Sequence, residues 1–463
     1  MGINRSILGF FLILLVCGPL QAVPERTVGM IGAAKVDITP DCPVRMYGYD
    51  SRRTESEGVA GRLKASALAI GADQGDGPAV LLTVDCGAVP TEIRAEVLRR
   101  VQAKTPLKSE RFMLCNAHSH SGPNLAGMAL FSGEQYEHLA RYKKELTDRL
   151  EEVVLKALAS RKPGRLDWTQ GSVGFAINRR VLKDGKWVNF GAAADAPVDH
   201  SLPLLRVTDI DGNLLAVVVN YACHNTTLGE RIKEIHGDWA GCAQEYIEAE
   251  HPGTVAMIAI GCGADANPEP RNKGIELCQQ HGRAMADEVN RLLAGPMKPV
   301  EPRVVARATS FDIPYEQPIP MDRLRQFAKT SLSGKFMLAL LEKGEKTPVA
   351  ETYDVASWTF GDDLAMVFLA DEVVVDYALR MKREFDGSRL WISAYTNEVS
   401  YYIESKRLLK EGGYEVRESL SAVLTYGQPE HIDPPMEDRV IEAVRQLLPE
   451  GFRSPTSKPV NDR

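Results

Sequence analysis

Residues 111–123 read RFMLCNAHSHSGP, and the rest of the chain is interpreted outward from this segment. Residues 111–115 form a short apolar run that predicts a buried strand, and Gly122-Pro123 stops regular structure. His118 and His120 would point to opposite faces of a continuing strand, but the break lets them meet in a loop. One imidazole could then hold a metal while the other handles a proton, although two surface histidines would give the same pattern.

Apolar strands and amphipathic helices alternate on both sides of this segment. Predicted strands cover residues 32–40, 63–70, 79–84, 111–115, 171–180, 202–207, 214–221, 254–260, 364–369 and 390–395, and predicted helices cover residues 91–103, 134–160, 241–251, 274–293 and 321–341. This alternation predicts an α/β fold, with a mixed β-sheet core flanked by helices and a metal site at the strand ends.

The N-terminus has the pattern of a secretory signal peptide. Arg5 precedes an apolar run over residues 7–16, and Leu20-Gln21-Ala22 offers a small-residue cleavage site. The run is too short to span a membrane. We therefore expect residues 1–22 to be removed and the protein to be secreted or periplasmic. Residues 23–446 are predicted to form one catalytic domain, and residues 447–463 a polar C-terminal tail.

Composition narrows the set of partners. A net charge of −7 and a pI near 5.8 argue against a nucleic-acid partner. Seven cysteines remain after the signal peptide, an odd and scattered set without a CxxC pair, so disulfides are not expected to frame the fold. Composition leaves open the oligomeric state, any disulfide pairing and a peripheral contact with a membrane.

Three apolar strands end abruptly in a residue that can bind a metal, namely His118, His224 and Glu372. Loops at strand ends are where α/β proteins build sites, because the sheet fixes their positions. Two imidazoles and a carboxylate with one open coordination position suit a catalytic zinc ion. These three residues lie too far apart in the sequence to form a local metal-binding motif, so their spacing cannot confirm a metal site. Purely structural roles remain an alternative for them.

Six ordered motifs between residues 31 and 414 resemble the N-terminal catalytic domain of the neutral (non-lysosomal) ceramidase family. They are AHSHSGP at residues 117–123, Asn178-Arg179, YACH at residues 221–224 with GDWAG at residues 237–241, ADANP at residues 264–268, Asp371-Glu372, and AYTNEVSYYI at residues 394–403. Tyr414 follows Tyr402 by twelve positions, as a second tyrosine does in the family.

The resemblance implies a zinc site and a set of residues around a reacting amide. The implied zinc ligands are His118, His224, Glu372 and Tyr402, and the implied catalytic residues are His120, Arg179, Tyr414, Asp265 and Asn267. His120 would pass a proton to the leaving amine, Arg179 and Tyr414 would donate hydrogen bonds to the developing oxyanion, and Asp265 would orient the site from behind. The neighbouring Arg180 is an alternative to Arg179, since the pair could also lie on the surface.

Three departures from the family pattern bear on the substrate. The family commonly has serine where Asn267 stands, and an amide cannot act as a nucleophile, so a zinc-water mechanism survives this change better than a serine mechanism. Asp371 replaces a glycine and would add charge near the metal. The chain is also expected to lack the C-terminal β-sandwich domain into which full-length ceramidases continue.

The sequence thus predicts an exported zinc-dependent amidohydrolase. We expect it to hydrolyse the amide of an N-acyl sphingosine-like lipid through a zinc-bound water. One alternative keeps the zinc but changes the substrate to another small-molecule amide or ester. The other is a non-catalytic binding protein on the same fold. Substituted metal ligands would have supported this alternative, and the intact ligands count against it.

Overall fold

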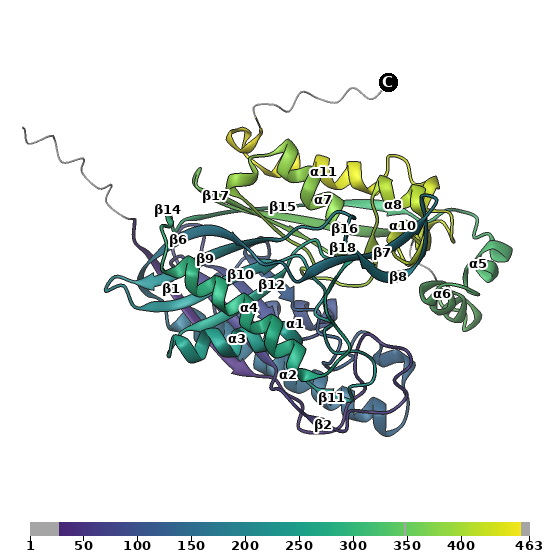
Figure 1. Cartoon of the computed structure of the whole chain (residues 1–463), viewed down its shortest axis with the longest axis horizontal. Coiled ribbons are helices and arrows are strands. Elements are labelled where there is room, and N and C mark those ends of the chain that lie inside the picture. Colours follow the sequence, from purple (N-terminus) through teal and green to yellow (C-terminus); the bar gives the residue numbers. More distant parts are fainter. Residues whose placement is uncertain (1–26, 347–348, 455–463) are drawn as a thin grey trace, which may run out of the picture.

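The computed structural model describes residues 27–346 and 349–454, and a nine-stranded mixed sheet forms its centre (Figure 1). Its order is β12-β10-β9-β6-β1-β3-β4-β5, with β14 paired to β6. β4–β5 and β10–β12 are parallel, and the other adjacent strands are antiparallel. The strands are β1 (Gly29–Asp37), β3 (Lys64–Ile70), β4 (Ala79–Val84), β5 (Phe112–Asn116), β6 (Lys162–Ser172), β9 (Ser201–Asp209), β10 (Leu214–Tyr221), β12 (Val255–Ile260) and β14 (Lys298–Val300).

Four helices cover one face of this sheet. Alternate residues of each strand point to this face, and their apolar side chains pack against the helices. Leu82 and Val84 of β4 pack in a core with α1 and α2, and Val219 of β10 packs in a core with α3 and α4. The helices are α1 (Thr91–Gln102), α2 (Glu134–Ala159), α3 (Asp238–Glu250) and α4 (Ile275–Leu293).

A second, four-stranded sheet packs against the opposite face. Leu81 and Val218 of the large sheet share a core with Met366 and Trp391 of the small one. Helices α7 and α11 cover its outer side, so the molecule is layered helix, sheet, sheet, helix (Figure 1). These elements are β15 (Val304–Pro314), β16 (Ala350–Phe360), β17 (Leu364–Leu369), β19 (Leu390–Ser393), α7 (Val375–Glu384) and α11 (Met436–Leu447). The predicted α/β class, with a mixed sheet flanked by helices, is confirmed.

The short remaining elements lie along one edge of these layers or project from it. They are β2 (Gly58–Val59), β7 (Ala176–Lys183), β8 (Lys186–Ala193), β11 (Glu234–Ile235), β13 (Ala266–Pro268), β18 (Glu372–Val373), β20 (Tyr402–Ile403), α5 (Met321–Phe327), α6 (Leu332–Glu342), α8 (Lys406–Glu411), α9 (Tyr414–Arg417) and α10 (Leu420–Leu424). They form small sheets β13-β7-β8, β18-β20 and β2-β11.

Two predicted elements were wrong in extent. The single strand over residues 171–180 is the end of β6 and the start of β7, which leaves the large sheet to pair with β8 and β13. Only Gly174 marks this break in the sequence, and both halves favour strands. The single helix over residues 321–341 is α5 and α6, because the Ser331 side chain accepts a hydrogen bond from the Gly334 amide and starts a new helix.

The two ends of the chain are only partly described. The predicted signal peptide lies outside the described residues, as do residues 455–463 of the predicted tail. In residues 447–454, Leu447, Leu448 and Phe452 are buried. Within the described ranges, no helix has both the length and the apolar character needed to cross a membrane.

Trp239 of α3 ties this helix to the loop after β10, because its Nε1 donates a hydrogen bond to the His224 carbonyl at 2.9 Å. We expect Trp239→Phe to lower the free energy of unfolding by about 1–3 kcal/mol more than Trp168→Phe does. Trp168 is the matched control, since it is also buried but its Nε1 has no partner among the described residues. Denaturant unfolding measures both variants, and equal losses would contradict the expectation.

Candidate functional site

Loops at the carboxyl ends of five strands meet at one edge of the molecule. These loops follow β5, β10, β12, β17 and β19. The strand pairs β4–β5, β10–β12 and β17–β19 are parallel. The two strands of each pair therefore have their carboxyl ends at the same edge of the sheet. Backbone hydrogen bonds from Asn116 to Tyr395 and from Ala394 to Ile260 join the two large sheets there. Residues far apart in the sequence are therefore brought together.

His118, His224 and Glu372 converge at this edge. Glu372 Oε2 lies 3.3 Å from His118 Nε2 and 3.2 Å from His224 Nε2. His120 Nε2 lies 3.2 Å from His118 Nε2, and the ligand nitrogens of the three histidines all lie within 4.8 Å of one another. His118 and His224 are buried, whereas His120 is partly buried. The three imidazoles and the carboxylate thus surround one point.

The outer nitrogens of two of these imidazoles are already engaged. His118 Nδ1 lies 2.8 Å from the Gly87 carbonyl oxygen, and His224 Nδ1 lies 2.9 Å from that of Gly263. A carbonyl only accepts hydrogen bonds, so each Nδ1 donates, and in the neutral form of either imidazole the Nε2 then carries a lone pair. Burial, with Arg179 nearby, lowers the pKa of His224 to about 4, so this imidazole is neutral at pH 7.

This arrangement fits a metal ion. The lone pairs of His118 Nε2 and His224 Nε2 face Glu372 Oε2, which is buried and has no hydrogen-bond donor among the described residues. Such a concentration of acceptors is unfavourable unless a cation satisfies it. The histidine group alone could hold a metal ion, and Glu372 offers a further oxygen. The sequence had assigned His120 to proton transfer, and the geometry also allows it as a ligand.

Tyr402 lies beside Glu372, its partner in the β18–β20 register. Arg179 Nη2 donates a hydrogen bond to the Tyr402 hydroxyl at 3.1 Å. Burial and the Glu372 charge raise the pKa of Tyr402 well above its usual value, so a phenolate at this position requires a neighbouring cation.

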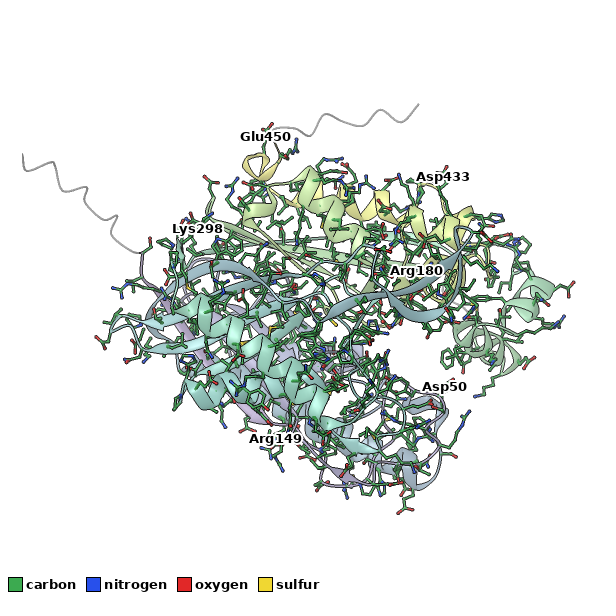
Figure 2. The ribbon with its side chains drawn as sticks, in the orientation of Figure 1. Asp50, Arg149, Arg180, Lys298, Asp433 and Glu450 are labelled. Carbon is green, nitrogen blue, oxygen red and sulfur yellow. The ribbon has the colours of Figure 1, made fainter. Side chains whose placement is uncertain are left out.

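The two neighbouring arginines on β7 have different surroundings. Arg179 forms a salt bridge with Glu415 at 2.8 Å, and its Nη1 lies 3.3 Å from His224 Nε2. Arg180, labelled in Figure 2, instead binds Glu411 of α8, the Gly412 carbonyl and Glu415. Both arginines are buried. The structure therefore places Arg179 in the site and Arg180 behind it.

Asp265 contacts elements that support the site. Its backbone carbonyl accepts a hydrogen bond from the Arg179 amide at 2.7 Å. Its carboxylate accepts hydrogen bonds from the Val375 amide and the Asn178 side chain, both at 2.9 Å. Burial raises the pKa of Asp265 to about 6. Asp265 thus holds together β7, which carries Arg179, and α7, which follows Glu372.

Asn267 and Tyr414 contact residues close to the site. The buried Asn267 side chain accepts a hydrogen bond from the Thr226 hydroxyl at 3.3 Å, two residues after His224. The Tyr414 ring lies 5.4 Å from the Tyr402 ring, and the Arg179 guanidinium lies 6.0 Å from it.

Asp371 holds the loop that precedes Tyr402. Its carboxylate accepts hydrogen bonds from the backbone amides of Ser400 and Tyr401. Its φ is 66°, a region in which glycine is at ease and aspartate is tolerated. Burial and the neighbouring Glu398 raise the pKa of Asp371 to about 8, which favours the neutral acid at pH 7. The added charge expected here is thereby reduced.

Sequence reasoning missed two tyrosines. Tyr395 has a φ of 53°, its ring lies 4.5 Å from the His118 ring, and its buried hydroxyl has no partner in the described part of the chain. It lies two residues after the end of β19, as His118 lies two residues after the end of β5, so the strand-end rule that selected His118 could have found it. Tyr47 lies 5.5 Å from His118 and from His120, packed so closely on Gly87 that a Cβ there would be 2.1 Å from its ring. Its loop has no sequence signal.

Comparisons with known proteins agree on one family. Residues 30–294 match the sequence model described as "Neutral/alkaline non-lysosomal ceramidase, N-terminal". The chain is 28% identical over 261 residues to neutral ceramidase A of Dictyostelium discoideum, covering 53% of this chain and 36% of that protein. For neutral ceramidase of Drosophila melanogaster the identity is 23% over 287 residues, with 57% and 38% covered. The matches thus span a little over a third of these relatives.

Solved structures share the fold. The structure titled "Ceramidase complexed with C2" superposes with a TM-score of 0.70 at 17% identity, covering 94% of this chain and 77% of the other. Neutral ceramidase from Pseudomonas aeruginosa gives a TM-score of 0.66 at 18% identity, with the same coverage. At this identity the likeness concerns the fold alone.

We expect the purified protein to carry about one divalent metal ion per chain when grown in metal-replete medium. His118→Ala and His224→Ala should each remove it, because either change deletes a ligand facing Glu372. His251→Ala is the control, since His251 binds Asn290 through its Nε2 and touches none of these groups. Elemental analysis measures the metal. A metal-free wild-type protein, or variants that keep the ion, would contradict the site.

Proposed function

The chain belongs to the neutral/alkaline non-lysosomal ceramidase family, and we propose that it is a zinc-dependent amidohydrolase that cleaves an N-acyl sphingosine-like lipid. One observation carries the proposal: two buried imidazoles direct their lone pairs at a buried carboxylate that lacks a donor. The same edge holds an arginine and a tyrosine that can donate hydrogen bonds. Export through residues 1–22 is part of the proposal.

In this proposal His118, His224, Glu372 and Tyr402 hold the metal. Imidazole nitrogens and carboxylate or phenolate oxygens suit zinc, and because zinc can expand from four to five ligands, a water molecule could bind beside these four side chains. A bound zinc ion would polarise the amide carbonyl and lower the pKa of a water molecule. The carbonyls of Gly87 and Gly263 keep both imidazoles in the tautomer that this requires.

His120 is the proposed proton carrier. Its Nε2 faces His118, and its buried Nδ1 has no partner among the residues described, beside Gly48. An imidazole placed there can take a proton from the attacking water and deliver it to the departing amine.

Arg179 and Tyr414 are the proposed donors to the oxyanion that develops on the amide carbonyl. The salt bridge to Glu415 holds the Arg179 guanidinium against His224 and Tyr402. Burial raises the pKa of Tyr414 above its usual value, so the hydroxyl keeps its proton and can donate it in a hydrogen bond. Donors held in place before the reaction lower its barrier, because they need not reorganise.

Asn267 supports attack by water rather than by a side chain. Its amide has no nucleophilic oxygen, and its Oδ1 is engaged by Thr226. The same departure keeps a second candidate function in view, hydrolysis of a different amide or an ester by the same site.

A substrate panel tests the proposal. We expect the purified protein to release fatty acid from a fluorescent N-acyl sphingosine, to lose this activity in a chelator and to regain it with added zinc. Turnover only of other amides or of esters would keep the hydrolase and replace the substrate. Absence of turnover across the panel by metal-loaded protein would favour a binding protein.

The two arginines predict a separation of activity from stability. We expect Arg179→Lys to lower kcat by about 10²–10³-fold, because a planar donor at the oxyanion is lost, and to lower the thermal midpoint less than Arg180→Lys does, because Arg179 pairs with one carboxylate and Arg180 with two. Arg180→Lys should instead lower the thermal midpoint, since Arg180 bridges Glu411 and Glu415, with kcat within about threefold of wild type. The opposite pattern would assign the site to Arg180.

A further inference from the structure

Helix α6 exposes an apolar stripe. Leu332 and Phe336, one turn apart, are 48% and 46% exposed, and the partly buried Leu340 continues the row. The opposite side of the helix packs inward through Gly334 and Met337. Large apolar side chains in such a row are a recognised sign of an interaction surface.

This stripe begins beside the candidate site. The Ser331 hydroxyl, just before α6, donates a hydrogen bond to Glu418 Oε2 at 2.8 Å. The Glu418 carbonyl in turn accepts a hydrogen bond from the Tyr402 amide at 3.2 Å. Leu332, the first exposed residue of the stripe, thus follows a residue that is hydrogen-bonded to Glu418, and Glu418 is hydrogen-bonded to the proposed ligand Tyr402.

The β7–β8 hairpin also contacts α9 and exposes apolar side chains beside it. Val188 and Phe190 of β8 are 47% and 46% exposed. The Phe190 ring lies 5.2 Å from that of Tyr414, and Trp187 packs on Gly413. Both elements thus border the short helix that carries Tyr414. Figure 1 shows α5 and α6 projecting from the body of the molecule.

The projecting helices carry positive charge. Residues 321–346 contain six Lys or Arg and three Asp or Glu, a net charge of +3 in a chain whose net charge is −7. Lys335 lies between Leu332 and Phe336, and Lys329 and Lys343 flank the helix. Apolar side chains interleaved with lysines are typical of helices that lie in the interface of an anionic membrane.

We propose that Leu332, Phe336, Val188 and Phe190 form a docking surface that binds an anionic phospholipid bilayer. This rests on the proposed function, since an N-acyl sphingosine-like substrate resides in a membrane with its amide near the headgroups. The surface places Tyr414, between its two parts, toward the bilayer. The lipid amide can then reach Arg179 and Tyr402 without the substrate crossing open water.

Vesicle co-sedimentation tests the surface without any need for turnover. We expect the wild-type protein to bind phosphatidylcholine vesicles that contain phosphatidylglycerol, and Leu332→Glu with Phe336→Glu to weaken this binding by about tenfold or more. Lys329→Glu with Lys335→Glu should weaken binding to these vesicles but not residual binding to pure phosphatidylcholine. Ile210→Glu is the matched control, because Ile210 is 50% exposed at the opposite end of β10 from His224.

A short-chain soluble substrate separates this proposal from the proposed function. The Leu332→Glu, Phe336→Glu protein should keep the wild-type rate on it, but lose about tenfold on the same amide embedded in vesicles. Wild-type protein that ignores anionic vesicles, or variants that bind them normally, would overturn the docking surface while leaving the hydrolase intact. Loss of the soluble activity with a normal thermal midpoint would also overturn it, by assigning the stripe to the substrate pocket. Vesicle binding without any hydrolysis would instead sink the proposed function alone.

Discussion

The candidate site depends on three buried side chains, His118, His224 and Glu372, whose hydrogen-bond acceptors lie close together. The backbone carbonyls of Gly87 and Gly263 accept hydrogen bonds from Nδ1 of His118 and His224, which orients both Nε2 atoms toward Glu372. Arg179 Nη1, 3.3 Å from His224 Nε2, offsets part of their mutual repulsion in a low dielectric, and a bound metal ion would offset the rest. The two large sheets supply the rigidity that holds them, since His118 and His224 follow one sheet and Glu372 follows the other.

A second network of buried ion pairs holds Arg179 next to these acceptors. Glu415 is buried between Arg179 and Arg180, and Glu411 and the Gly412 carbonyl accept further hydrogen bonds from Arg180. Two buried arginines would be costly alone, but the carboxylates of α8 and α9 compensate them. The pair thereby anchors β7, an edge element outside the main sheet, to the segment that carries Tyr414. The same segment contacts β8 through Tyr414 and Phe190, and the residue before α6 through Glu418 and Ser331. The candidate site and the proposed docking surface therefore depend on the same segment.

Sequence patterns predicted the elements that bury regular faces. β4 and α2 agree with expectation to within a residue, because long apolar periodicity is set locally. The patterns were wrong where a single residue redirects the chain. Gly174 separates β6 from β7, and Ser331 caps α6, yet neither residue differs from many that leave a strand or helix intact. The position at a strand end selected His118, His224 and Glu372. The sequence does not show which strands pair, so it could not predict that these three residues meet.

The sequence by itself determined the α/β class with a mixed sheet flanked by helices, the strand ends whose side chains could bind a metal, and, through ordered motifs, the family. These depend on local periodicity and on residue identity, which the sequence contains directly. Only the tertiary structure decided that Arg179 rather than Arg180 faces His224, that His120 joins the other histidines, and that Tyr395 and Tyr47 enclose them. Those relations depend on which side of an edge strand or loop faces the interior, and contacts between segments hundreds of residues apart set that choice.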